Sequence, residues 1–177
     1  MANFKIALDL VFAHEGTYVN DPSDTGGETY KGVARSVWPK LALWKLVDVM
    51  KNYATFPTNL DTNPGIQQSI ENFYETEYWN KIRGNEITNQ DIANSIFDFA
   101  VNSGVVTSII LAQNAVGTTP DGIIGHNTLD LFNTYDKSNF IIAFTLLKIV
   151  RYVHIVKKRP ESRKYFYGWV CRSIGEN

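Results

Sequence analysis

A mainly α-helical fold is predicted from three features of this sequence of 177 residues. Apolar residues recur at helical spacing through most of the chain. Hydrophobic residues make up 44% and charged residues 20%, which suits a packed core and excludes wholesale disorder. One long segment rich in Gly, Asn, Asp and Thr, residues 16–34, follows the first predicted helix. We therefore expect a mainly α fold with a short irregular or β-hairpin segment after the first helix.

The predicted helices are separated by polar, Gly-rich or Pro-containing segments. They cover residues 3–14, 37–52, 64–79, 88–104, 105–116, a short stretch from 128, 138–157 and 162–174. Thr88 and Asp91, three residues apart before an apolar run, predict a capping-box start for one of them. The apolar stretch 140–147 is predicted to be a buried core helix, because Lys148 and Arg151 interrupt it. It is far shorter than the roughly 20 residues that span a bilayer, so no membrane span is expected.

Charge is unevenly distributed although the formal net charge is only −1. Residues 148–177 contain eight Lys and Arg but two acidic residues. Such an end either attracts an anionic polymer or is a solvated helix face. Its aromatic residues also fit a nucleic-acid surface. We favour a packed amphipathic helix and expect no nucleic-acid partner.

Four carboxylates fall within residues 15–28, and two of them suggest chemistry. Glu15 closes a helix of apolar residues, where partial desolvation raises the pKa of a carboxyl toward that of a general acid. Asp24 lies in a Gly-rich turn, where it remains ionised. Two carboxylates in different environments are what glycosidic bond cleavage requires. Acidic residues in turns also serve as caps and Asx-turns, so spacing alone leaves both interpretations open.

Metal sites fit the sequence less well. The acidic segment does not follow the register of an EF-hand calcium loop. The three histidines and Cys171 are scattered, without the close spacing of zinc ligands. A single cysteine also excludes an internal disulfide framework. We expect neither a metal nor another cofactor.

A long motif near the N-terminus resembles the signature of glycoside hydrolase family 108, which comprises bacterial and phage N-acetylmuramidases, some labelled secretion activators. The motif is Glu15-Gly16-x-Tyr18-Val19-Asn20-Asp21-Pro22-x-Asp24-x-Gly26-Gly27-x-Thr29-x-x-Gly32. Three later segments resemble the family's peptidoglycan-binding half, its D-G-x-x-G-x-x-T-L turn and its closing helices. They are residues 97–104, residues 121–129, and Arg151 with Phe166-x-Gly168-Trp169-x-x-Arg172.

The resemblance implies a lysozyme-like peptidoglycan hydrolase that cleaves the β-1,4 bond between N-acetylmuramic acid and N-acetylglucosamine. It implies a catalytic half at residues 1–86 and a helical, peptidoglycan-binding half at 87–177, packed as one compact unit. By the same carry-over Glu15 is the catalytic acid. Phage-type lysozymes show a related Glu–eight residues–Asp–five residues–Thr arrangement. Asp24 keeps the first spacing and would position water, whereas Thr29 comes one residue early and Tyr30 occupies the Thr position.

Four further residues are candidates for substrate binding: Tyr18, Asn20, Tyr30 and Asn102. The two tyrosines either stack on sugar rings or pack in the core. Asp98, between two phenylalanines, is expected to be a hydrogen-bonded structural carboxylate.

The expected partners are peptidoglycan glycan strands, with the protein acting as a monomer. The first residues show no apolar leader segment. We therefore expect synthesis in the cytoplasm and action on the wall after lysis or export, aided by a holin or an exporter.

Two alternatives remain. One is an inactive peptidoglycan-binding or export-assisting protein. It is suggested by Thr17, where the family usually has Gly, because a β-branched residue is strained at positive φ. The other is a lytic transglycosylase, which uses a single acid–base Glu and leaves 1,6-anhydro ends.

Overall fold

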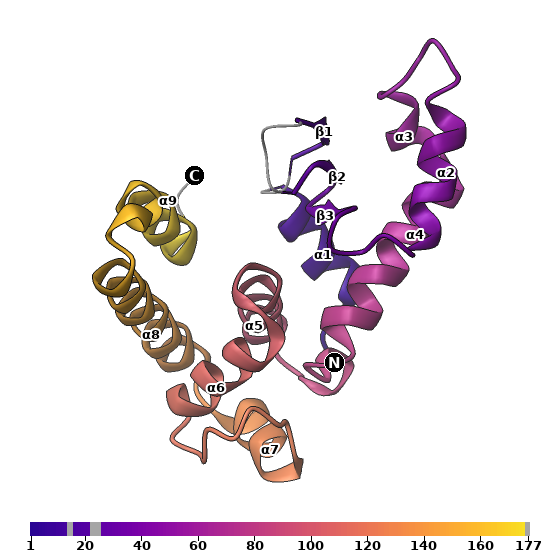
Figure 1. Ribbon diagram of the computed structural model, residues 1–177. Coiled ribbons are helices and arrows are strands. Elements are labelled where there is room, and N and C mark those ends of the chain that lie inside the picture. The colour runs from indigo at the N-terminus through magenta and orange to yellow at the C-terminus, as the bar shows by residue number, and fades with distance from the viewer. Residues whose placement is uncertain (14–15, 22–25, 176–177) are drawn as a thin grey trace. The chain divides into compact units, whose positions relative to one another are not determined.

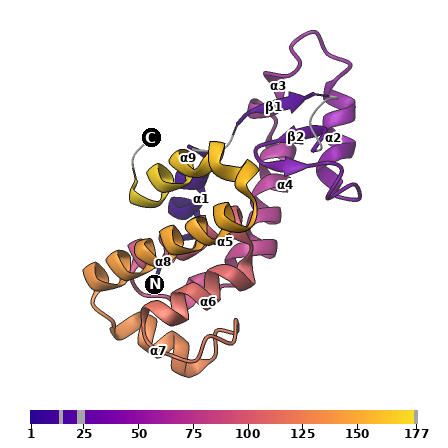
Figure 2. The same ribbon diagram turned by 60° about the vertical axis from the view of Figure 1, so that its left-hand side comes forward.

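The computed structural model describes residues 1–13, 16–21 and 26–175. The chain divides into two compact units, Phe4–Lys81 and Ile82–Asn177 with Met1–Asn3. They are called the N-terminal and C-terminal units below, and each is described on its own (Figures 1 and 2). Helices dominate both units, and the strands form one small sheet, which confirms the predicted mainly α, lysozyme-like class.

The N-terminal unit combines helices with a three-stranded antiparallel sheet of order β1-β2-β3. Its strands are β1 (Tyr18–Asn20), β2 (Glu28–Tyr30) and β3 (Val33–Ala34). Its helices are α1 (Phe4–Phe12), α2 (Ala42–Met50), α3 (Asn59–Thr62) and α4 (Pro64–Tyr74), and α4 continues as the π-helical turn η1 (Glu75–Trp79). The irregular segment predicted after the first helix thus contains the sheet, and α3 lies between the predicted helices 37–52 and 64–79.

Packing of α4 against its neighbours builds the core of this unit. Pro64 occupies the first turn of α4, where its missing N–H costs nothing, and the side chain of Asn63 caps the helix by accepting from Ile66 N. Ile66 and Ile70 are fully buried, as the apolar periodicity predicted. The buried Trp79 at the end of η1 contacts the ring of Phe4 on α1.

Helix α2 begins at Ala42, five residues later than predicted. The carbonyl of Trp38 accepts hydrogen bonds from the indole of Trp44, at 2.8 Å, and from Leu41 N, so residues before α2 form turns instead. Pro39 lies in those turns rather than in a first helical turn.

The C-terminal unit consists of packed helices. Its elements are η2 (Gly84–Glu86), α5 (Gln90–Ser103), α6 (Val105–Ala115), α7 (His126–Thr134), α8 (Lys137–Lys158), η3 (Pro160–Ser162) and α9 (Arg163–Ile174). Gly104, at φ 89°, turns α5 back onto α6. Helix α8 packs against α5 and α6, and α9 packs against α8.

Two helix starts in this unit differ from the predictions. Asn89, not Thr88, caps α5, because its Oδ1 accepts from Asp91 N and Ile92 N. The side chain of Thr88 instead contacts Asn133. Helix α7 begins at His126, two residues before the predicted Thr128.

Helix α8 is buried on one face only, so the prediction of a buried core helix at 140–147 is half wrong. Phe140 and Phe144 are fully buried, whereas Ile142 and Leu146 are 61% and 58% exposed. By length and composition alone α8 is apolar enough to cross a membrane, a property that the core helices of many globular proteins share.

A buried glutamine holds the turn between α6 and α7. The Nε2 of Gln113 lies 2.7 Å from Asp121 Oδ1 and 3.0 Å from Ile123 O, and its Oε1 accepts from Gly122 N at 2.9 Å. Gln113 is fully buried, whereas Asp121 and Ile123 are exposed, so the glutamine links the interior to the turn at the surface.

Replacing Gln113 by Leu keeps the bulk of the side chain but removes all of these hydrogen bonds, and the N–H of the half-buried Gly122 loses its acceptor. We expect the free energy of unfolding to fall by about 2–3 kcal/mol, measured by urea denaturation. The adjacent exposed Asn114 supplies the control, and Asn114→Ala should change it by less than about 0.5 kcal/mol. Similar losses in both variants would contradict a special role for Gln113.

Candidate functional site

The two predicted catalytic carboxylates, Glu15 and Asp24, lie outside the described residues. The site is therefore built from the residues that flank them. Glu15 falls in the connection between α1 and β1, and Asp24 falls in the connection between β1 and β2. The N-terminal unit supplies all of these flanking residues.

Lys31 contacts residues on both sides of the first connection. Its ammonium lies 4.7 Å from the ring centre of Phe12, and its backbone N–H donates to the carbonyl of Thr17 at 3.3 Å. Its own carbonyl accepts from the hydroxyl of Tyr74 at 2.7 Å. One residue thus ties the end of α1, the start of β1 and α4 together.

A two-residue turn gives Lys31 this position. Tyr30 pairs with Val33, so Lys31 and Gly32 form the turn between β2 and β3. Their φ angles are 44° and 76°, the positive pair that a tight hairpin of this kind requires. Gly32 takes such an angle freely, whereas a lysine there carries backbone strain.

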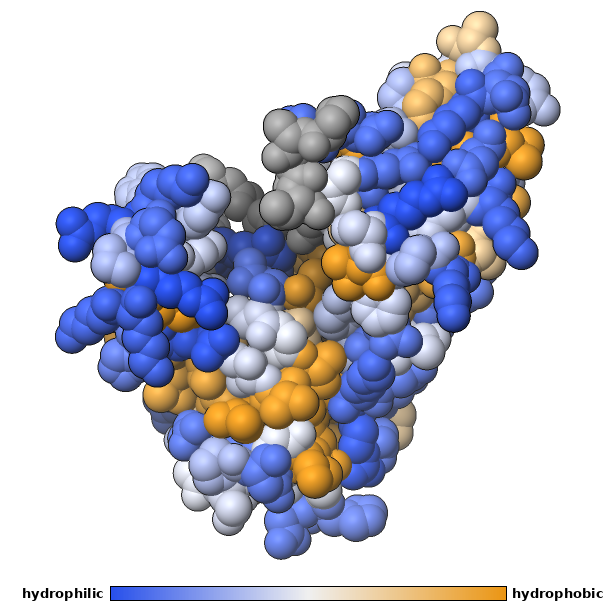
Figure 3. Space-filling model, in the orientation of Figure 1, coloured by the Kyte–Doolittle hydropathy of each residue, from blue (hydrophilic) through white to orange (hydrophobic). Residues whose placement is uncertain are grey.

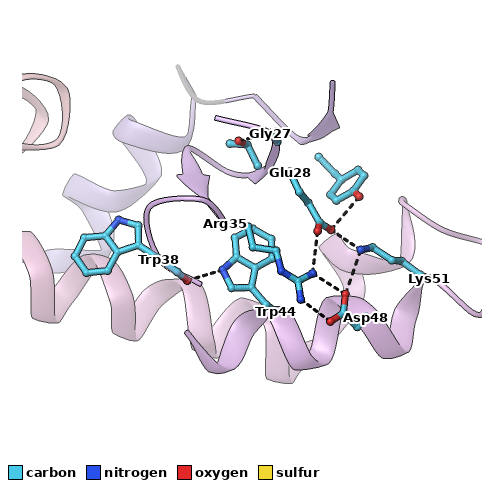
Figure 4. A network of polar contacts seen from close by, with 9 residues as sticks. Gly27, Glu28, Arg35, Trp38, Trp44, Asp48 and Lys51 are labelled. Carbon is cyan, nitrogen blue, oxygen red and sulfur yellow. Dashed lines mark hydrogen bonds and ion pairs between the residues drawn. The ribbon is translucent and has the colours of Figure 1, made fainter. Parts of the chain in front are cut away.

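Glu28 anchors the second connection through an ion-pair network (Figure 4). Its carboxylate lies 2.9 Å from Arg35 Nη1 and 2.7 Å from Lys51 Nζ, and it accepts from the hydroxyl of Tyr18 at 3.0 Å. Asp48 on α2 completes the network by accepting two 2.7 Å hydrogen bonds from the Arg35 guanidinium. Arg35 also lies over the ring of Trp44. The network therefore joins β1, β2 and α2.

Charge in this network sets the protonation of its acids. Burial alone would raise the pKa of Glu28, but hydrogen bonds from Lys51, Arg35 and Tyr18 outweigh it and hold the pKa below its ordinary value. Hydrogen bonds from Arg35 likewise hold the pKa of Asp48 far below its ordinary value. Burial, and then the hydrogen bond to Glu28, raises the pKa of Tyr18. Both acids are ionised at neutral pH, so neither is suited to donate a proton.

Four predicted site residues lie in the first two strands: Tyr18, Asn20, Thr29 and Tyr30. Tyr18 packs edge-on against Phe56, with 4.7 Å between ring centres, and donates to Glu28. Asn20 is exposed and pairs with Glu28 in the register of the sheet. The hydroxyl of Thr29 donates to Gly27 O at 3.3 Å.

Tyr30 is fully buried, so its ring has no free face for a sugar. Its hydroxyl lies 2.9 Å from Asp61 Oδ1 and accepts from Gln67 Nε2 at 2.9 Å. Of the two roles that the sequence left open for this ring, the structure gives it packing.

The other candidates belong to the C-terminal unit. Asn102 is exposed on α5, where its Oδ1 accepts from the hydroxyl of Ser103. Asp98 accepts from Arg172 Nη2 at 2.7 Å and from its Nε at 3.2 Å, which confirms the expected structural carboxylate. This bond fastens α9 to α5.

Thr17 is not strained in the way that the sequence suggested. Among the described residues, positive φ angles outside glycine occur at Lys31 and Arg83, so Thr17 adopts ordinary backbone geometry. A missing glycine at this position therefore gives no conformational reason for inactivity.

Sequence reasoning missed the roles of Lys31, Arg35, Asp48 and Lys51. Asp48 and Lys51, three apart on a predicted helix, carried a local signal of an ion pair. The ion pair between Glu28 and Lys51 carried no such local signal, because the two residues lie far apart in the sequence. In the part of the chain that the structure describes, no cluster of three His, Cys, Asp or Glu side chains is arranged to hold a metal.

Replacing Glu28 by Gln tests the network. The amide still accepts from Tyr18 but leaves Arg35 and Lys51 without their buried counter-charge. We expect the free energy of unfolding at pH 7 to fall by about 1–3 kcal/mol. Glu77→Gln, which breaks the exposed pair with Lys81, is the control and should cost less than about 0.5 kcal/mol.

The pH dependence of the free energy of unfolding provides a second test of the network. Because the pKa of Glu28 is lower in the folded protein, its stabilisation is complete above its ordinary value of 4.5 and is lost as pH falls through the folded value. Between about pH 5 and pH 3 the parent protein should therefore lose stability more steeply than Glu28→Gln. Parallel profiles in urea denaturation would show that the network does not stabilise the fold.

Comparisons with known proteins match two families along the chain. The family described as Glycosyl hydrolase 108 matches residues 8–104, and the family described as Predicted Peptidoglycan domain matches residues 107–174. A search of curated proteins finds no match.

The solved structure of Brucella abortus SagA is similar in fold. It is 24% identical in sequence, with a TM-score of 0.66, over 96% of this chain and 88% of that one. The first family match spans more than half of the chain and contains the sheet, the ion-pair network and both connections. The chain therefore belongs to glycosyl hydrolase family 108 and is a glycoside hydrolase of the kind that acts on peptidoglycan.

Proposed function

We propose that this protein is an N-acetylmuramidase that cleaves the β-1,4 bond between N-acetylmuramic acid and N-acetylglucosamine, with Glu15 as general acid. The observation that carries the proposal is the anchoring of the residues around Glu15. Phe12 and Thr17 both contact Lys31, and Lys31 is in turn held by Tyr74. A catalytic acid needs flanks fixed in this way, because general acid catalysis depends on position to within a fraction of an ångström.

Asp24 is proposed to position the attacking water. It lies in the connection between Asn20 and Glu28, which are paired in the sheet. The Glu28 network holds the far end of this connection, and Ser36 donates to Gly26 O at 2.9 Å. If Glu15 and Asp24 leave room for a water between them, the reaction inverts the anomeric centre.

Glycan binding is proposed to involve residues of both units. Asn20 is exposed and Tyr18 partly exposed in the N-terminal unit. Asn102 is exposed in the C-terminal unit, which contains the region matched by the peptidoglycan family. For the residues of both units, the proposed ligand is the glycan strand of peptidoglycan.

A digest of purified peptidoglycan sacculi tests the reaction directly. Wild type and Glu15→Gln are each incubated with sacculi, and the products are reduced and analysed by mass spectrometry. We expect reducing N-acetylmuramic ends from wild type and at least a hundredfold fewer from the variant, since general acid catalysis contributes 10²–10⁴-fold. Glu77→Gln, a like substitution at an exposed ion pair, should retain full activity.

Each other outcome selects a different function. Products with 1,6-anhydro ends would identify a lytic transglycosylase. Binding to sacculi without release of products by either protein would identify a binding protein. Equal products from wild type and Glu15→Gln would show that another residue is the acid.

Thr17 provides a second test, aimed at the inactive alternative. Because its backbone is unstrained, Thr17→Gly should neither stabilise the protein nor raise its rate of product release more than about twofold. A large gain in activity on sacculi would show that threonine at this position impairs the enzyme.

A further inference from the structure

Helix α8 presents an apolar row that no described residue covers. Ile142, Leu146 and Val150 are spaced by four and are 61%, 58% and 50% exposed. Side chains spaced by four lie on one face of a helix, and His154 continues the same row. The row is about three helical turns long, so it is a continuous strip rather than scattered apolar residues.

A groove runs beside this row between α6 and α8. Its volume is about 350 Å³, and it is lined by Leu111, Asn114, Leu147, Val150, Arg151, His154, Ile155 and Lys158. Its walls thus combine four aliphatic side chains with an amide, an imidazole and two cations. Figure 3 shows hydrophobic surface over α6 and the adjoining part of α8, beside hydrophilic surface over α9.

Six cations gather toward the C-terminal end of α8. They are Arg151, Lys157, Lys158, Arg159, Arg163 and Lys164, and among the described residues no carboxylate pairs with any of them. Between residues 137 and 175 the sequence contains one acid, Glu161. The Nε atom of Arg151 is buried without a hydrogen-bond partner, although the residue lines the groove. A buried donor without an acceptor costs stability.

We propose that this surface of α6 and α8 binds an anionic phospholipid bilayer. The apolar row would enter the boundary between headgroups and acyl chains, and the cations would contact lipid phosphates. A polysaccharide would pair with the cations but would give Ile142 and Leu146 nothing apolar to contact. The proposal is independent of the proposed enzymatic function.

The net charge of the protein indicates which part of it would be attracted to an anionic bilayer. At a formal net charge of −1 the whole chain has no attraction to an anionic surface. Binding must therefore come from the local cluster of cations, whose field dominates within about 10 Å at moderate salt. Lysines and arginines near such a surface each strengthen binding about fivefold.

Vesicle sedimentation tests the proposal with the full chain. Vesicles of phosphatidylglycerol and phosphatidylethanolamine are compared with vesicles of phosphatidylcholine alone. We expect binding to the anionic vesicles, at least tenfold weaker binding to phosphatidylcholine, and release of the protein at 0.5 M salt.

Two double variants separate the components of the surface. Lys157→Gln with Lys158→Gln should weaken binding about 25-fold. Leu146→Gln with Val150→Gln should weaken it at least tenfold, because two exposed apolar side chains no longer enter the bilayer. The controls are Lys137→Gln, about 30 Å away along α8 and paired with Asp91, and Val49→Gln on α2, and both should bind as wild type does.

Four results would overturn the proposal. The first is no binding to anionic vesicles. The second is unchanged vesicle binding by the Leu146 and Val150 variant, which would show attraction of charge alone. The third is a loss of sacculus binding in the double variants while their binding to vesicles is unchanged, which would assign the surface to peptidoglycan. The fourth is a concentration-dependent dimer in light scattering that the same variant abolishes, which would assign it to a second copy of the chain.

Discussion

One buried carboxylate, Glu28, is the constraint on which the N-terminal unit depends. The strands of the sheet are two or three residues long, too short to persist without support from other elements. Glu28 lies on the central strand with its side chain only 11% exposed, and it binds Tyr18 of β1, Arg35 just after β3, and Lys51 just after α2. Residues two apart in a strand share a face, so Tyr30 follows Glu28 into the same packed side and bonds to α3 and α4. Thr29 points to the opposite face. Tyr30, which occupies the Thr position of the phage-lysozyme spacing, is therefore part of the packed core.

The turn beside the candidate site contains a strained residue, Lys31, together with the contacts that stabilise it. Lys31 adopts a left-handed conformation that costs a non-glycine residue about 1 kcal/mol or more, and such residues persist only where their surroundings hold them. Here the surroundings are Tyr74 on its carbonyl, Thr17 on its N–H and Phe12 beneath its ammonium. The lysine uses its backbone and its side chain at once, which glycine could not do. The strain is thus explained by the contacts with which Lys31 joins Phe12, Thr17 and Tyr74.

The spacing of apolar residues predicted the helices because each helix buries one face. This spacing can be seen within a short stretch of sequence. It could not place the boundaries that depend on tertiary hydrogen bonds, such as the late start of α2, where the indole of Trp44 takes the Trp38 carbonyl. The acidic segment could be identified as the candidate site from composition and motif. The residues that hold it could not, because the partners are distant in sequence: Tyr30 and Asp61 are 31 residues apart, and Lys31 and Tyr74 are 43 apart. The strain proposed for Thr17 failed for a related reason, since φ depends on the path of the chain rather than on residue type.

Helix α8 shows how a buried polar group can decide which apolar face remains outside. Both of its faces are rich in apolar residues, so hydrophobicity alone does not fix its rotation. Lys148 does: only 5% exposed, it lies over the rings of Phe99 and Phe144 and donates to Ser95 Oγ at 3.3 Å. Burial lowers its pKa to about 8, against the opposing effect of Asp98, so the charge is tolerated only with these contacts in place. Phe144 lies on α8 itself, but turning the helix by one residue, about 100°, would remove the lysine from Phe99 and Ser95 on α5. The rotation that satisfies Lys148 is the one that directs the strip from Ile142 to Val150 outward.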